Sequence, residues 1–190
     1  MGSMGGCMKD SASAVSIQSM LRRIIVVGLL VGVADYAIGF GLFVATLGAP
    51  ILRVLQHPAS GLLGPDAYRG GAKTAVLGVF LHFAIAIVWA GLFAVAYRAS
   101  RVLREATSHN LHAFGVATLA GVGVWVVMNN VVLALGRGRP YSTDSWLFWT
   151  ILLLHIPFVG MPLVWGTRRY VPSVATDAQL DRAAPHRGTA

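Results

Sequence analysis

Charged side chains are scarce in this chain. Asp, Glu, Lys and Arg make up 12% of its 190 residues, whereas a soluble domain has about a quarter. Hydrophobic residues account for 56%, and the mean hydropathy is +0.68. A soluble fold with this composition would lack the polar residues needed to cover its surface. The composition therefore predicts an integral membrane protein.

Other features are also missing. Cys7 is the single cysteine, so neither an intrachain disulfide nor a cysteine cluster is possible. The sequence has no Walker motif, no Rossmann glycine fingerprint, no HExxH and no GxSxG. We therefore expect a non-enzymatic protein that has no cofactor and no metal site.

The net charge of +8 first suggests a nucleic-acid partner. The basic residues, however, lie between apolar runs and do not form a patch. This distribution is typical of the ends of membrane helices. It indicates a lipid bilayer as the partner and argues against nucleic acid.

Four apolar stretches are long enough to cross the hydrocarbon core, which needs about 20 helical residues. They cover residues 24–47, 74–97, 113–135 and 146–165. We predict an all-α membrane protein, a bundle of four transmembrane helices over residues 24–170. Residues 1–23 are expected to form a cytoplasmic tail, and residues 171–190 a disordered cytoplasmic tail.

The orientation is predicted from the Lys and Arg residues outside the spans. The N-terminal segment, the second loop and the C-terminal segment hold ten of them, and the first and third loops hold five. This difference predicts that both termini lie in the cytoplasm, in a bacterial inner membrane.

The first loop, residues 49–74, is the longest. Pro50 can open a short helix, "ILRVLQ" is amphipathic, and "ASGLLG" is small and apolar. These features favour an interfacial or shallow re-entrant segment, and a plain surface helix is the alternative.

Asp35 lies near the middle of the first span. Helical spacing places it on one face with Gly28, Gly32 and Gly39, and Gly28 and Gly32 form a GxxxG packing pattern. Asp35 is therefore predicted to point toward another helix. It is either a neutral packing acid or a proton or cation site.

Two histidines lie inside other spans. His82 shares a helix face with Gly78, and His155 precedes Pro157 in a fourth helix that its prolines should kink. Each is predicted to be a hydrogen-bond partner. The alternative is a metal ligand, which would need several other ligands to converge on the same metal. From the rise per residue, Asp35 is predicted to lie at the depth of His155, and His82 at the depth of Asn129 and Asn130. We therefore expect that Asp35 can pair with His155, and His82 with either asparagine.

Asn129 and Asn130 stand together in "VVMNNVV". Adjacent residues differ by about 100° around a helix, so each amide can face a different neighbour. They either form hydrogen bonds that hold membrane helices together or line a polar cavity open to the outer side.

With the spans placed, the chain resembles a family of small four-helix bacterial membrane proteins that has no assigned activity. The resemblance rests on "ASGLLG", the Gly70–Gly71 pair, "LGVFLHFAIA", "VMNNVV" and "LLHIPFVGMPL", and it covers about residues 24–170. It implies the architecture but no mechanism.

Three functions remain open from the sequence. The first is a non-enzymatic helical bundle, as a homo-oligomer or as an accessory subunit of a membrane protein partner. The second is a small proton- or cation-coupled transporter that uses Asp35. The third is a haem-binding membrane subunit with His82 and His155 as axial ligands.

Overall fold

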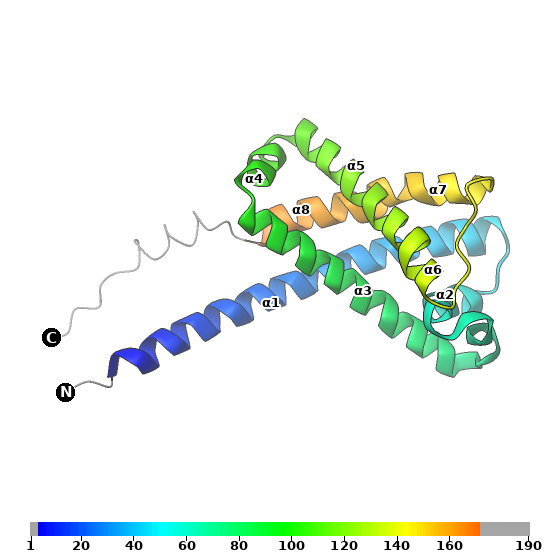
Figure 1. Ribbon diagram of the computed structural model, residues 1–190, viewed down its shortest axis with the longest axis horizontal. Helices are drawn as coiled ribbons and strands as arrows, with labels where there is room; N and C mark the ends of the chain where they lie inside the picture. The colour runs from blue at the N-terminus through cyan, green and yellow to red at the C-terminus, as the bar shows by residue number, and fades with distance from the viewer. Residues whose placement is uncertain (1–3, 172–190) are drawn as a thin grey trace.

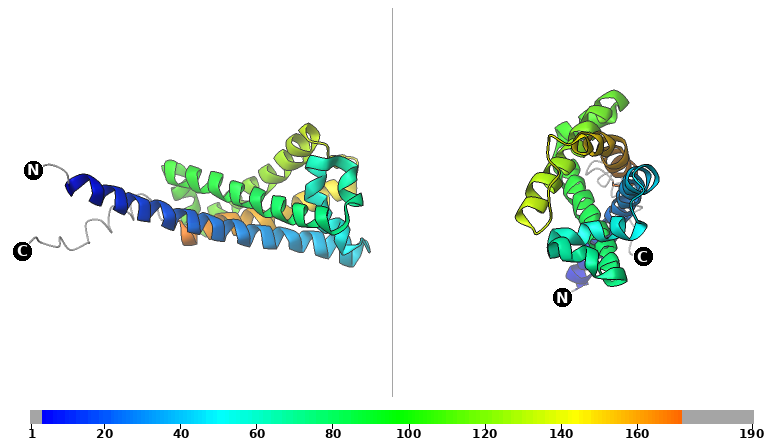
Figure 2. Two further views of the ribbon diagram at one scale, coloured as in Figure 1. Left: turned by 90° about the horizontal axis from the view of Figure 1, so that it is seen from below. Right: turned by 90° about the vertical axis from the view of Figure 1, so that its right-hand side faces the viewer.

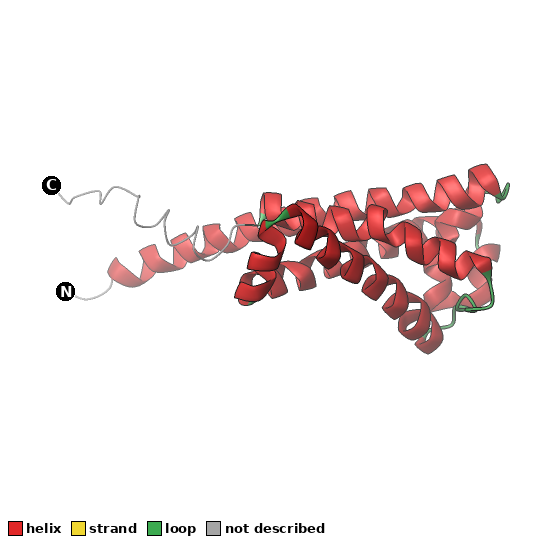
Figure 3. Cartoon of the chain, turned by 90° about the horizontal axis from the view of Figure 1, so that it is seen from above, coloured by secondary structure: helices red, strands yellow, loops and turns green. Residues whose placement is uncertain are grey.

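The computed structural model describes residues 4–171, with side chains from Ile17 onward. Within these residues all regular structure is helical and no strand occurs (Figure 3), which confirms the all-α prediction. Four stretches are long and apolar enough to cross a membrane: Ile17–Thr46, Gly71–Ala99, Asn110–Leu135 and Trp146–Tyr170. The fold is thus compatible with a membrane protein. The predicted tail after Val171 lies outside the described residues.

Three of the four long stretches contain a π-helical turn. The first is α1 (Met4–Ile38) with η1 (Gly39–Thr46), and the second is α3 (Gly71–Ala99) alone. The third is α5 (Asn110–Val127), η3 (Met128–Val132) and α6 (Leu133–Leu135), and the fourth is α7 (Trp146–His155), η4 (Ile156–Gly160) and α8 (Met161–Tyr170). Figure 1 shows their arrangement. The turn η4 contains Pro157, where the sequence predicted a disturbed helix.

The first helix begins much earlier than the predicted span. Helix α1 starts at Met4 and projects beyond the bundle (Figure 1), so the segment predicted to be a cytoplasmic tail is helical from Met4 onward. The sequence before Arg22 contains no proline. Polar residues can end a membrane span without ending the helix, because they remain compatible with helical backbone.

Small residues allow the long helices to approach closely. Helix α1 packs against α3 on one side and against η4 and α8 on the other, and α5 packs on the fourth stretch. A Cβ at Gly28 would lie 2.6 Å from Cα of Ile87, and one at Gly32 would lie 2.7 Å from the Phe83 ring. The two glycines of the GxxxG pattern therefore lie at the contact between α1 and α3.

The first loop forms a helix, α2 (Ile51–Leu63), followed by the 3-10 turn η2 (Gly64–Arg69). It packs against α3 and η1 at one end of the bundle (Figure 2). A Cβ at Gly78 would collide with the Leu55 carbonyl, and the Gly61 carbonyl accepts a 2.8 Å hydrogen bond from Arg137 N–H. Ile51, Leu52 and Leu62 are exposed, as expected for an interfacial segment.

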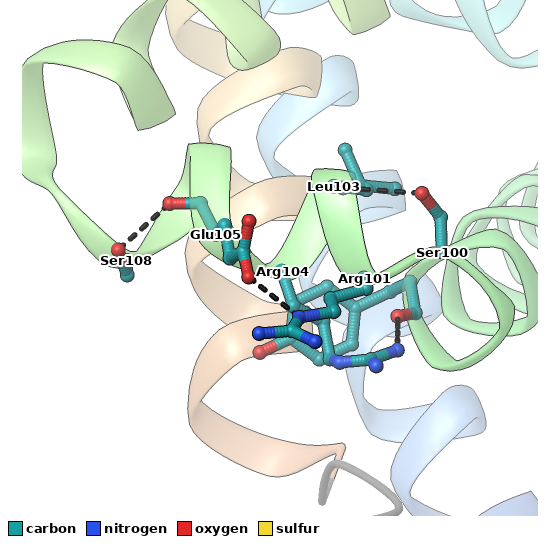
Figure 4. Close-up of polar contacts among 7 residues, drawn as sticks. Ser100, Arg101, Leu103, Arg104, Glu105 and Ser108 are labelled. Carbon is teal, nitrogen blue, oxygen red and sulfur yellow. Dashed lines mark hydrogen bonds and ion pairs between the residues drawn. The ribbon is translucent and has the colours of Figure 1, made fainter.

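The opposite end of the bundle is held by α4 (Arg101–Ser108). Arg104 donates hydrogen bonds to the carbonyls of Tyr97 and Arg98 at the end of α3, at 3.1 and 2.6 Å. Ser100 caps α4 by accepting from Leu103 N–H, and Arg101 pairs with Glu105 (Figure 4). These bonds satisfy carbonyls and amides that helix ends leave free.

The outer surface of the bundle is apolar. Large hydrophobic side chains are exposed along the long helices, among them Leu29, Val76, Phe80, Leu92, Leu119 and Leu153. Water is a poor solvent for such a continuous surface, whereas lipid tails are not.

Candidate functional site

Asp35 lies between two histidines from different helices. Its Oδ2 is 3.8 Å from Nδ1 of His82 on α3, and its Oδ1 is 3.7 Å from Nε2 of His155 on α7. The Asp35 side chain is 30% exposed, against 12% for His82 and 8% for His155. These three residues, called the Asp35 cluster below, bring a partly accessible carboxyl together with two imidazoles.

The hydrogen bonds of the histidines determine which ring nitrogens carry protons. Nε2 of His82 lies 2.8 Å from the Gly32 carbonyl, and Nδ1 of His155 lies 2.7 Å from the Ile151 carbonyl. A carbonyl oxygen can only accept, so both of these nitrogens are N–H donors. In the neutral rings, the nitrogens that face Asp35 therefore carry lone pairs.

This arrangement leaves the Asp35 cluster without a hydrogen-bond donor unless one of its groups is protonated. An ionised carboxylate would face a lone pair of a neutral imidazole on each side. One proton supplies a donor, either as a carboxylic acid that donates to a ring or as an imidazolium that donates to the carboxylate. The separations of 3.7 and 3.8 Å exceed direct hydrogen-bond length, about 3.2 Å at most, so a small movement brings Asp35 to either ring.

The Asp35 cluster lines a cavity of about 540 Å³. Cavities of 300–1,000 Å³ typically hold small organic ligands. Most of the wall is apolar and comes from all four long stretches, with Val31, Ile85, Val124, Met128 and Ile151 among the lining residues. Gly39 also lines the cavity, where a Cβ would lie 2.9 Å from Val54 of α2. The π-turns η1, η3 and η4 all contribute, and π-turns are frequent at functional sites.

Aromatic rings connect the Asp35 cluster to the end of the cavity beneath α2. Tyr36 stacks on His82 with 3.9 Å between ring centroids, and Trp125 lies 4.9 Å from His155. The series continues from Trp125 to Tyr141 at 5.8 Å and from Tyr141 to His57 at 6.1 Å. The sequence did not predict these ring contacts, because the rings that meet come from separate segments of the chain.

Asn129 holds the third loop over the cavity. It is fully buried, its Oδ1 accepts from Tyr141 N–H at 2.8 Å, and its Nδ2 donates to the Tyr141 carbonyl at 3.1 Å. Nδ2 also donates to Oδ1 of the exposed Asn130 at 3.2 Å. The predicted pairing of His82 with an asparagine is therefore wrong. Asn129 fixes a loop backbone, and His82 bonds to Gly32 and faces Asp35.

Helix α2 and the turn η2 supply the remaining polar groups of the cavity. Nδ1 of His57 lies 2.9 Å from the Tyr68 hydroxyl, and the guanidinium of the exposed Arg53 lies 5.4 Å from the Tyr68 ring centre. Burial lowers the pKa of His57, and the charge of Asp35 partly opposes this. Burial, with the nearby Tyr68, raises the pKa of Tyr141 to about 12. His57 and Tyr141 are therefore neutral at pH 7.

The site geometry gives no support to the haem alternative. An iron held by His82 and His155 would lie between their lone-pair nitrogens, and the carboxyl of Asp35 occupies that position. Among the described residues, no group of three or more His, Cys, Asp or Glu side chains has the geometry of a metal site.

Comparisons with protein-family models, with curated proteins and with solved structures found no match to this chain. The resemblance to small four-helix bacterial membrane proteins stays a prediction.

Proposed function

We propose that this chain is a small proton-coupled carrier in the bacterial inner membrane, with both termini in the cytoplasm. Ligand binding in the cavity is linked to proton exchange at the Asp35 cluster. The observation that carries this proposal is the convergence of two imidazole lone pairs on a carboxyl that remains accessible from an apolar cavity.

The surroundings of Asp35 favour this function over a purely structural bundle. A packing acid would be closed off by a direct hydrogen bond, whereas Asp35 is 30% exposed and lies beyond bonding distance of both rings. Intramembrane ionisable groups commonly belong to ion or proton pathways. The ten-to-five distribution of basic residues supports the orientation, in which α2 covers the outer end of the cavity.

The pH inside proteoliposomes, followed with a trapped pH-sensitive dye, tests the carrier function. The probes are 4-phenylbutylamine, 4-phenylbutanol and 4-phenylbutyrate, which share one apolar body but differ in charge. We expect at least one probe, added outside wild-type vesicles, to move protons across the membrane, and this proton flux should change with the pH gradient and disappear in Asp35→Asn. Asp66→Asn, which changes an exposed carboxyl outside the cavity lining, should keep the proton flux.

Proton fluxes in wild-type vesicles that match those in Asp35→Asn and protein-free vesicles for all three probes would contradict the proposed function. The comparison with protein-free vesicles also removes the background from passive permeation of the neutral probe forms.

A further inference from the structure

The carboxylate of Asp35 faces one imidazole lone pair on each side when the cluster holds no proton. Its Oδ2 faces Nδ1 of His82, and its Oδ1 faces Nε2 of His155. The Gly32 and Ile151 carbonyls hold both rings in the tautomers that present these lone pairs. Each pair of acceptors, a carboxylate oxygen and a ring nitrogen, matches a cation that carries more than one N–H donor.

A primary ammonium is such a group, because it carries three N–H donors and no acceptor. Two acceptors that each lie about 2.8 Å from a tetrahedral nitrogen are about 4.6 Å apart. The acceptors here are 3.7 and 3.8 Å apart in the two pairs with Asp35. An opening of about 1 Å in either pair, within the reach of side-chain movement, is enough for the nitrogen to contact both acceptors of that pair.

We propose that the cavity binds a primary amine with an apolar body, and that one proton leaves the Asp35 cluster as the ammonium group enters. This inference rests on the proposed carrier function and names its substrate class. The apolar and aromatic wall and the cavity of about 540 Å³ accommodate the body of the molecule. The ammonium group contacts Asp35 and one of the two histidines that face it.

Charge balance fixes the stoichiometry. With one proton, the cluster is neutral, whether the proton lies on Asp35 or on a histidine. The ammonium needs the carboxylate and the facing ring nitrogen free, so that proton leaves to water as the +1 ligand arrives, and the site stays neutral. A charge buried in an apolar site is strongly unfavourable unless it is paired, so we expect a one-for-one exchange.

The other ionisable groups around the cavity do not replace Asp35 as the anion. They are Tyr36 on α1, Arg53 and His57 on α2, Tyr68 on η2 and Tyr141 in the third loop. Asp35 is the one carboxyl among the residues that line the cavity.

Isothermal titration calorimetry of the full chain in lipid nanodiscs tests this inference. Titrations with 4-phenylbutylamine in two buffers of different ionisation enthalpy at pH 7 report the number of protons released. We expect about one proton per amine, and an affinity that weakens about tenfold per pH unit as the pH falls. The N,N,N-trimethyl analogue has the same charge but no N–H donor, so it should bind at least tenfold more weakly. Asp35→Asn should remove amine binding.

Equal affinity for the trimethyl analogue would overturn the ammonium site, as would amine binding that releases no proton. These two readouts use the wild-type chain, so they do not depend on the folding of a variant. If 4-phenylbutanol or 4-phenylbutyrate drives a proton flux that requires Asp35 while the amine does not bind, the substrate class is wrong and the carrier function stands. If no probe drives such a flux, the carrier function fails as well.

Discussion

The imidazole of His155 faces the carboxyl of Asp35 with 3.7 Å between Nε2 and Oδ1. The Ile151 carbonyl, 2.7 Å from Nδ1, fixes the tautomer of the ring. His82 lies on the other side of the carboxyl with the reverse arrangement of nitrogens. Its Nδ1 faces Asp35, and its Nε2 bonds to the Gly32 carbonyl. The carboxyl of Asp35 thus has a base on each side and a cavity in front, which is the basis of the proposed function.

The tautomers of His82 and His155 can be measured directly. We predict that neutral His82 carries its proton on Nε2 and neutral His155 on Nδ1. Nitrogen-15 NMR of histidine-labelled protein in nanodiscs distinguishes these forms, and His82→Gln and His155→Gln assign the signals. A His155 signal of the Nε2–H form would contradict the lone-pair geometry.

Arg53 distinguishes a cationic ligand from an anionic one. Its guanidinium is exposed near Tyr68 and lines the cavity, so its charge repels an entering cation. We expect Arg53→Gln to tighten 4-phenylbutylamine binding about two- to fivefold at low salt. Arg69→Gln, which changes an arginine paired with Asp66, should have no effect. Weaker amine binding in Arg53→Gln would show that Arg53 helps to hold the ligand.

Asn129 should matter for stability far more than its neighbour Asn130. Asn129→Leu leaves the N–H and carbonyl of Tyr141 without their partner, and an unsatisfied buried polar group costs about 1–3 kcal/mol. Asn130→Leu changes an exposed side chain, so the expected effect is within about 0.5 kcal/mol. Thermal unfolding in mild detergent compares the two variants, and equal losses would contradict the role of Asn129 in holding the loop.

Close packing of α1 on α3 predicts different responses from two glycines. At Gly28 an added Cβ would lie 2.6 Å from the Ile87 backbone, whereas at Gly115 it would meet nothing within 4 Å. We expect Gly28→Ala to destabilise the protein by about 1–3 kcal/mol through overpacking. Gly115→Ala should be neutral or slightly stabilising, because alanine favours the helix. The same unfolding assay measures both, and a neutral Gly28→Ala would contradict the packing.

His57 gives a pH dependence of stability with a defined sign. Burial lowers its pKa below 6.5 in the folded protein, so below pH 6.5 the unfolded chain binds the proton more readily. The free energy of unfolding should therefore fall as the pH drops below about 6.5, and His57 should not change it above that pH. His57→Gln should weaken this acid dependence of the melting temperature, whereas His109→Gln, at an exposed position, should retain it. An unchanged dependence in His57→Gln would show that His57 is not its source.

Parts of this site follow from the sequence, and the reasons differ from residue to residue. Helix periodicity and depth were enough to direct Asp35 toward a neighbouring helix and to place His155 at its level. The height of His82 relative to Asp35 depends on how α3 packs against α1 at Gly28 and Gly32. Residue spacing within one helix does not reveal this register between two helices. Asn129 bonds to a loop backbone, and backbone partners leave no pattern in the sequence.

The cavity itself could not be predicted, since its outer end depends on α2. The amphipathic pattern of residues 51–56 favoured an interfacial segment. It did not show that His57 and Tyr68 would line the same apolar cavity as the Asp35 cluster, because that follows from the packing of α2 against α3 and η1.

Infrared difference spectroscopy of the protein in nanodiscs tests the central claim, that Asp35 and its two histidines share a proton, most directly. Spectra taken across a pH titration show the carbonyl stretch of each carboxylic acid that gains a proton, and subtraction of Asp35→Asn spectra isolates Asp35. We predict an Asp35 band that shifts in frequency or in its titration when His82 or His155 is replaced by Gln, with the exposed Asp66→Asn variant as the control. A difference spectrum that contains no Asp35 band, or one that neither histidine affects, would contradict the shared proton and with it the proposed carrier.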